Sequence, residues 1–269
     1  MQIRSSRLLT AVFALLFALA LSLPGFAEDS ATKASLGKYD AQIQADVNKK
    51  LQDKDKLRDV RATVQDGIVT LTGNVKLFRD KLQADHIAHH VEHAQGVRNE
   101  ISVLQAGGKD GQTMSDQQLR EKLAERLRYD RVDQGVTFNN FALDVNHGVV
   151  TVNGEARSPV DKDSALSIIE NTPGVVDVVD NIKVLPVSPM DDELRLRVAR
   201  AIYGYPALQK YAIDPQSPIR IVVENGKVTL YGVVDSQIDK QLAEMQANQV
   251  SGVFSVTDRL VVAGQTAQK

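Results

Sequence analysis

Four of the five histidines of the chain lie within eight residues, at positions 86, 89, 90 and 93. On a helix that advances about 100° per residue, all four fall within an arc of roughly 100°. Histidines four residues apart on a helix are well spaced to chelate one metal ion. The cluster of His86, His89, His90 and His93 therefore predicts a site for Zn²⁺, Cu²⁺ or Ni²⁺. The alternative is a solvated helix face that becomes charged near pH 6.

The same stretch approaches the His-x-x-Glu-His pattern of a metalloprotease, but His89 stands where the glutamate base is needed. Other enzyme signatures are missing. The chain has no cysteine nucleophile, no Gly-x-Ser-x-Gly and no dinucleotide-binding fingerprint. Lys109 follows a glycine, yet Asp110 occupies the place where a phosphate loop needs Ser or Thr. We therefore expect a protein that is not an enzyme.

A second group of chemically active side chains is basic: Arg120, Lys122, Arg126, Arg128 and Arg131. Glu121 and Glu125 are interleaved with them, which favours a salt-bridged solvent face. The alternative is a contact with anionic lipid headgroups, to which each basic residue near the surface contributes about 1 kcal/mol. A third group consists of tyrosines, which we expect to cover the edge of a core rather than form a recognition loop: Tyr203, Tyr205 and Tyr211.

The composition restricts the cellular context. Arg4 and Arg7 precede an uncharged apolar run that ends in Pro24-Gly25-Phe26-Ala27, which is typical of a cleaved export signal. We therefore expect residues 1–27 to be removed, leaving an exported chain without a transmembrane span. The formal net charge of −2 argues against general binding of nucleic acid. Because the chain has no cysteine, its stability must come from packing.

These side chains sit on a scaffold that is repeated three times. Each copy has a strand, a two-residue turn, a second strand with alternating apolar residues and a closing glycine. The turns suit type I′ hairpins because each contains a glycine. The turn and closing glycines are Gly67, Gly73, Gly148, Gly154, Gly226 and Gly232. The closing glycines recur at about 80 residues, and such a steady period indicates a structural repeat.

Each hairpin is preceded by one amphipathic stretch and followed by another, then by a last strand. Ser115 and Gln118 form the pattern of a capping box at the start of the second copy. The expected order in each copy is helix, strand, strand, helix, strand, which is an α+β fold. The expected boundaries are a lead-in at 28–37, a first domain at 38–106, a linker at 107–113, a second domain at 114–185, a proline linker at 186–189, a third domain at 190–263 and a tail at 264–269.

This arrangement resembles the BON domain family of bacterial osmotically inducible periplasmic and nodulation-associated proteins. The first signature is Val/Ile-x-Leu/Val-x-Gly, which ends at Gly73, Gly154 and Gly232. The second is Gly-Val followed by Val-x-Asp/Asn-x-Ile/Leu-x-Val, and residues of the second copy fit it: Gly174, Val175, Val178, Asn181, Ile182 and Val184. The first copy departs, because His93 stands in place of the glycine, so we expect an altered turn there.

The resemblance implies a three-stranded mixed sheet in each domain, with two helices packed on one face. It also implies roles at the bacterial envelope: osmotic protection, membrane integrity and, in some members, binding of anionic phospholipid. It supplies no catalytic residues and no cofactor. The glycines are expected to be structural and to allow a bulge or a close approach of the following helix. The expected partners are anionic phospholipid or envelope proteins.

Overall fold

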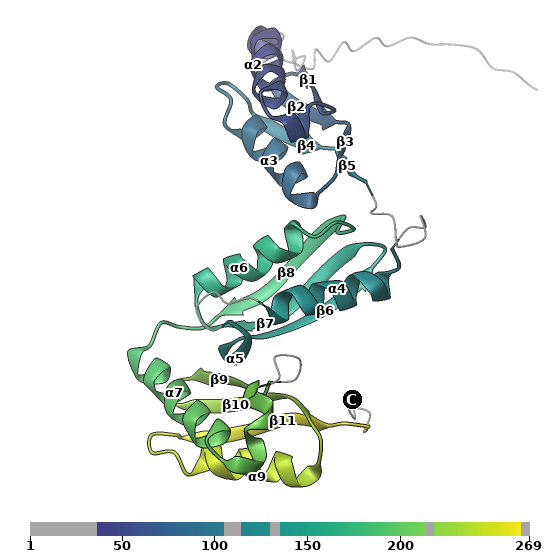
Figure 1. The fold of residues 1–269 in the computed structure, drawn as a ribbon. Coiled ribbons are helices and arrows are strands. Elements are labelled where there is room, and N and C mark those ends of the chain that lie inside the picture. The colour runs from purple at the N-terminus through teal and green to yellow at the C-terminus, as the bar shows by residue number, and fades with distance from the viewer. Residues whose placement is uncertain (1–36, 105–113, 130–134, 214–217, 265–269) are drawn as a thin grey trace, which may run out of the picture.

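The computed structural model of the protein describes residues 37–104, 114–129, 135–213 and 218–264. These residues form three small α+β units, which Figure 1 shows one after another; we call them units 1, 2 and 3. The predicted fold class of three tandem α+β units is confirmed. The predicted export signal at 1–27 lies outside the described residues, as do the linker at 107–113 and most of the lead-in and the tail.

The elements of each unit follow the predicted order, with short helical turns added. Unit 1 contains η1 (Gly37–Tyr39), α2 (Asp40–Gln52), η2 (Asp55–Leu57), β1 (Arg61–Gln65), β2 (Ile68–Thr72), β3 (Asn74–Val75), α3 (Phe78–His89), β4 (Gly96–Asn99) and β5 (Ser102–Val103). Unit 2 contains α4 (Asp116–Arg128), α5 (Gly135–Phe138), β6 (Asn140–Asn146), β7 (Val149–Ala156), α6 (Pro159–Glu170) and β8 (Asp177–Val184). Unit 3 contains α7 (Pro189–Tyr203), η4 (Pro206–Leu208), α8 (Lys210–Ile213), β9 (Arg220–Glu224), β10 (Lys227–Val234), α9 (Gln237–Asn248) and β11 (Ser255–Val262).

Each unit has a mixed sheet whose central strand is the second strand of the hairpin. In unit 2, β7 pairs antiparallel with β6 and parallel with β8, and β10 pairs in the same way with β9 and β11. In unit 1 the sheet is β1-β2-β4, and the short β3 and β5 continue β2 and β4 as a separate pair. The two long helices of a unit cover one face of its sheet (Figure 1). Ser115 caps α4 in the predicted capping box.

In each unit one carboxylate from the first helix forms hydrogen bonds with the hairpin turn. Asp191, in the first turn of α7, accepts hydrogen bonds from the backbone N–H groups of Asn225 and Gly226, at 2.9 and 2.8 Å. Asp40 binds the turn of unit 1 and Asp116 the turn of unit 2 in the same two-bond manner. Both turn residues have positive φ, for example 53° and 74° in unit 3, as a type I′ turn requires. The first helix is thereby fastened to the hairpin three times in one way.

The closing glycines make room for the first strand of the hairpin. Gly73, Gly154 and Gly232 have φ values of 123°, 135° and 135°, a region that residues with a Cβ rarely enter. A Cβ on Gly154 would lie 1.8 Å from the carbonyl oxygen of Asn140. The close neighbour is therefore backbone at or just before the first strand, and the structure differs here from the expected approach of the following helix.

The outer edge of the third strand is protected by side chains. In each unit an Asp or Asn on this strand accepts a hydrogen bond from the backbone N–H of the residue two places later. The acceptor and donor pairs are Asn99 and Ile101, Asp180 and Ile182, and Asp258 and Leu260. Lysines of the second helix bind the same edge, since Lys162 and Lys240 donate to the carbonyl oxygens of Ile182 and Leu260. The polar position of the sequence motif is thus Asp180, not Asn181, which bonds Asn153 instead. Such groups hinder pairing with a further strand.

The turn before the last strand is not altered in unit 1, and that expectation was wrong. His93 has a φ of 68°, in the left-handed region, where Gly174 and Gly252 have 106° and 93°. Histidine is one of the residues that tolerates this region better than most. Its ring stacks on Tyr39, with ring centroids 3.9 Å apart. The histidine therefore replaces the glycine at the same point of the turn.

Replacing Asp116 by Asn should loosen the turn of unit 2, because an amide has one acceptor oxygen for two N–H donors. Hydrogen bonds from the backbone of Gly148 and His147 lower the pKa of Asp116 below its ordinary value. The stabilisation is therefore complete above that ordinary value and is lost as pH falls through the lowered pKa. Hydrogen exchange of the Gly148 amide should be faster in Asp116→Asn than in wild type at neutral pH, and the difference should shrink in acid. Asp163→Asn, at an exposed acid of the same unit, is the control.

Gly154→Ala should destabilise unit 2 by more than about 2 kcal/mol, since the new Cβ meets the backbone of Asn140 and the φ is unfavourable. Gly264→Ala is the matched control, because Gly264 also has positive φ but has no atom within 4 Å of the new Cβ. Thermal unfolding of both variants measures the difference. Equal losses would show that backbone conformation alone, and not the close approach, requires the glycine.

Candidate functional site

The structure separates the four clustered histidines. Helix α3 ends at His89, His90 caps it, and His93 lies beyond it with left-handed backbone. The expected single helix face of four imidazoles was therefore wrong. The rings of His86 and His90 lie together, with centroids 4.1 Å apart. His89 faces Asp85 at 3.4 Å.

Only part of the histidine cluster has the geometry of a chelate. Nδ1 of His90 lies 2.8 Å from the carbonyl oxygen of His86, which leaves Nε2 of His90 for a ligand. In the described ranges no group of three or more His, Cys, Asp or Glu residues is arranged to hold a metal ion. The predicted Zn²⁺, Cu²⁺ or Ni²⁺ site therefore reduces to a two-histidine hypothesis, and it stays a prediction.

Some basic side chains of unit 2 already make contacts within the protein, and others do not. Arg126 donates to the carbonyl oxygen of Asn171 and the hydroxyl of Thr172, at 3.1 and 2.8 Å, and so joins α4 to the end of α6. Burial lowers the pKa of Arg220 of unit 3, and the charge of the nearby Arg128 lowers it further. Arg131 lies outside the described residues.

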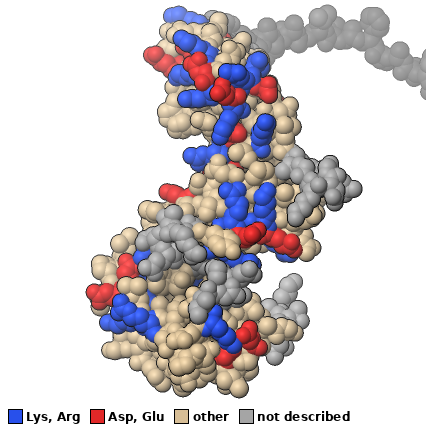
Figure 2. Space-filling model, viewed as in Figure 1, with Lys and Arg blue, Asp and Glu red and all other residues tan. Residues whose placement is uncertain are grey.

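Arg120 and Lys122 remain on α4 without a carboxylate partner in the described part of the chain. The expected salt-bridged face is thus not formed by ion pairs within the described α4. Figure 2 shows Lys and Arg side chains side by side over the middle of the molecule, with acidic side chains nearby. Arg120 and Arg126 are exposed and Lys122 and Arg128 are half-buried, so the basic group lies at the surface along α4, although Arg126 is already bonded.

The tyrosines of unit 3 pack against its core, as predicted. Tyr211 is buried, and its hydroxyl donates to the carboxylate of Asp239 at 2.8 Å and accepts the N–H of Asp235 at 2.7 Å. Tyr203 and Tyr205 are partly buried against the same core. Burial tends to raise the pKa of Asp239, but the bonds from Lys210 and Tyr211 outweigh it and hold that pKa below its ordinary value. The segment is therefore structural.

Units 2 and 3 meet through a row of polar side chains. Asn140, Glu155 and Lys183 lie opposite one another on the three strands of the unit 2 sheet. Each contacts unit 3: Arg220 donates to Asn140 at 3.3 Å, Tyr231 to Glu155 at 3.4 Å, and Lys183 to Glu224 at 2.7 and 2.8 Å. One register position of the unit 2 sheet thus provides polar contacts from all three strands.

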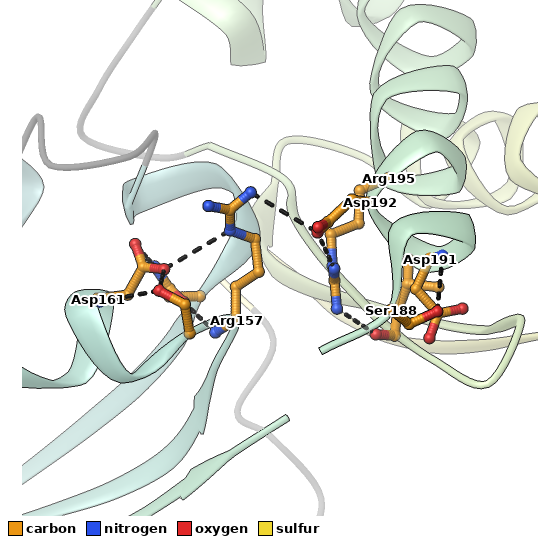
Figure 3. A network of polar contacts seen from close by, with 9 residues as sticks. Arg157, Asp161, Ser188, Asp191, Asp192 and Arg195 are labelled. Atoms are coloured by element: carbon orange, nitrogen blue, oxygen red, sulfur yellow. Dashed lines mark hydrogen bonds and ion pairs between the residues drawn. The ribbon is translucent and has the colours of Figure 1, made fainter. Parts of the chain in front are cut away.

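A network of charged side chains, some buried and some partly exposed, also joins units 2 and 3 (Figure 3). Arg157, which follows β7, lies 3.6 Å from the carboxylates of both Asp161 and Asp192. Asp192 also pairs with Arg195, whose side chain is only 2% exposed and donates to the carbonyl oxygen of Val223. Asp192 thus links a guanidinium of unit 2 with one of unit 3. Arg195 is the most buried arginine of this network, and removal of Asp192 would leave its guanidinium bonded to the carbonyl oxygen of Val223 but without the carboxylate with which it pairs.

An apolar contact completes the junction of the two units. Phe138 of α5 is 3% exposed and packs in the core cluster of unit 3 rather than in that of its own unit. Burial raises the pKa of Tyr203, whose hydroxyl bonds to the carbonyl oxygen of Ile219. Units 1 and 2 share a cluster of buried hydrophobic residues, and Arg79 pairs with Glu170 across them at 2.9 Å.

Residues 39–105, 115–186 and 191–264 each match the BON domain. The chain belongs to the BON domain family. BON domains are associated with periplasmic or envelope proteins, and proteins built from them are generally non-enzymatic. Within the described ranges of this BON protein, we find no helix with the length and apolar character needed to cross a membrane.

Two further kinds of similarity are weaker. The chain is 26% identical over 146 residues to an uncharacterised protein in the 5′ region of gshII from Anaplasma centrale; the match covers 54% of this chain and 94% of that protein. Two structures of CdsD, a structural protein of the type III secretion system of Chlamydia trachomatis, are also similar. One has 13% identity and a TM-score of 0.23, with 82% of this chain and 92% of CdsD covered. The other, of the C-terminal domain, has 12% identity and a TM-score of 0.22, with 81% and 96% covered.

Sequence reasoning missed the residues that join the BON units. Arg157 and Asp192 are 35 positions apart in the sequence and carry no local pattern that pairs them. From the sequence, Asp191 and Asp192 stand at a helix start and complement the helix dipole, which gives no indication of their distant partners. A usable signal was present in the repeat, because an Asp stands in the first turn of the first helix in all three copies: Asp40, Asp116 and Asp191.

We predict that Cu²⁺ or Ni²⁺ binds to the pair of His86 and His90, because only these two imidazoles lie together. His86→Ala and His90→Ala should each weaken binding at least about tenfold in calorimetry of the untagged protein. His93→Ala is the control and should leave the affinity unchanged, since its ring is occupied by the stack on Tyr39. A wild-type protein without measurable affinity would end the metal hypothesis, and an equal effect of His93→Ala would require the cluster to rearrange.

Proposed function

We propose that this BON protein is exported to the periplasm, has no enzymatic activity and acts by binding an anionic phospholipid surface, thereby supporting membrane integrity or osmotic protection. The observation that supports this most directly is on α4. Arg120 is exposed, Lys122 is partly exposed, and neither has a carboxylate partner within the described structure. Of the remaining basic residues, Arg126 is exposed but bonded to Asn171 and Thr172, Arg128 is half-buried, and Arg131 lies outside the described ranges.

The electrostatics of such a contact are modest and local. A basic residue close to an anionic leaflet contributes about 1 kcal/mol, and the attraction disappears beyond a Debye length, about 8 Å at physiological salt. Two residues therefore give weak, reversible, salt-sensitive binding. A contact of this strength is typical of a protein that associates reversibly with a membrane surface. The alternative partner is an envelope protein, for which the same charges would act as a steering patch.

Co-sedimentation with vesicles tests the proposal. Arg120→Ala/Lys122→Ala should lower the affinity for vesicles that contain phosphatidylglycerol by about 30-fold, which corresponds to about 2 kcal/mol. The control is Lys49→Ala/Lys54→Ala on unit 1, which removes two exposed charges of the same kind. Equal binding of the wild type to anionic and zwitterionic vesicles would contradict the electrostatic contact. Absence of any vesicle binding would favour the alternative, an adaptor that binds only envelope proteins.

A further inference from the structure

The hairpin-turn end of a unit differs among the three copies. At this end the turn, the residues before the first helix and the turn after the second helix come together. In unit 1 it is covered by the stacked rings of Tyr39 and His93. In unit 2 the corresponding place holds Met114 and Val176, both partly buried. The scaffold thus allows this end to be closed by its own side chains.

Unit 3 leaves the same end open. Among the large hydrophobic side chains that the structure describes, the three most exposed are Val187 at 83%, Met190 at 81% and Phe254 at 80%. Met190 precedes Asp191, whose carboxylate binds the N–H of Gly226. The N–H of Phe254 donates to the carbonyl oxygen of the same Gly226, at 2.8 Å. These contacts place Met190 and Phe254 at one turn, with Val187 just before α7.

Around this end of unit 3, most acidic side chains are already bonded, whereas two basic side chains are not. The acids Asp191, Asp192 and Glu224 are already bonded to the turn, to Arg195 and to Lys183. Arg197 and Lys227 are exposed and have no carboxylate partner among the described residues, while Glu193 is the exposed acid nearby. Figure 2 shows basic side chains on unit 3 where α7 lies in Figure 1. The end therefore presents apolar side chains beside two available cations.

We infer that this end of unit 3 is a second membrane contact, which inserts Val187, Met190 and Phe254 into the headgroup region of an anionic bilayer. The inference rests on the proposed function, in which phospholipid is the partner. Apolar side chains beside Arg and Lys are the composition of interfacial anchors. Three side chains on separate turns are too few to bury the roughly 800 Å² per partner of a stable protein complex. A bilayer accepts them without a matching groove.

The absence of tryptophan from the chain provides a direct measurement. Phe254→Trp introduces a single indole at the proposed contact. Its emission should shift to the blue on addition of vesicles of phosphatidylcholine and phosphatidylglycerol, and brominated lipid should quench it. The control is Val179→Trp, at a side chain 43% exposed on β8 of unit 2, which should show neither change. Vesicle binding with an unchanged signal at residue 254 overturns this inference and leaves the contact through α4 standing.

A second pair of variants tests the energetics. Met190→Ala/Phe254→Ala should lower vesicle affinity at least about tenfold without loss of folding, because both side chains are exposed. Ile238→Ala is the control, since Ile238 is 67% exposed at the start of α9, after β10 has run away from the turn. Unchanged affinity of the double variant overturns the inference. Failure of the wild type to bind any vesicle overturns both the inference and the proposed function.

Discussion

The two-bond clamp between a helix carboxylate and a hairpin turn is the constraint on which each unit depends. A type I′ turn directs two successive N–H groups to one side, and Asp40, Asp116 or Asp191 accepts both. The clamp fixes where the first helix starts relative to the sheet. The apolar stripe of the helix then faces the central strand, and the closing glycine lets the first strand approach it.

The local parts of this design could be predicted from the sequence. The turns, the closing glycines, the helix stripes and the capping box at Ser115 depend on neighbours a few residues apart, so their patterns are visible in one chain. The clamp and the pairing of Arg157 with Asp192 depend on partners 26 or more positions away, and no spacing rule connects them. The prediction of a single histidine face was wrong for another reason. The helix ends at His89, and His93 lies in the turn that follows, with left-handed backbone.

The three BON units use a common core and differ on their surfaces. Unit 2 gives Phe138 to the core of unit 3 and uses Arg126 inside its own unit, so part of its apparent surface chemistry serves assembly. Because Arg126 is already bonded, counting every basic residue of α4 as available overstates the positive charge that a partner would contact. The polar row of Asn140, Glu155 and Lys183 joins unit 2 to unit 3 alongside the buried side chain of Phe138. Function is therefore expected in the side chains that assembly leaves uncommitted.

The side chains that occupy the edge of each third strand also determine how such units can be combined. Asp180 and Asp258 occupy backbone donors that a neighbouring strand would need, and Lys162 and Lys240 occupy the acceptors. Three similar sheets in one chain are otherwise candidates for mispairing and strand exchange during folding. With these edges occupied, the sheets stay separate, and units add to one another through faces and helix ends. A chain of this kind can be lengthened by duplication without merging its copies into one sheet.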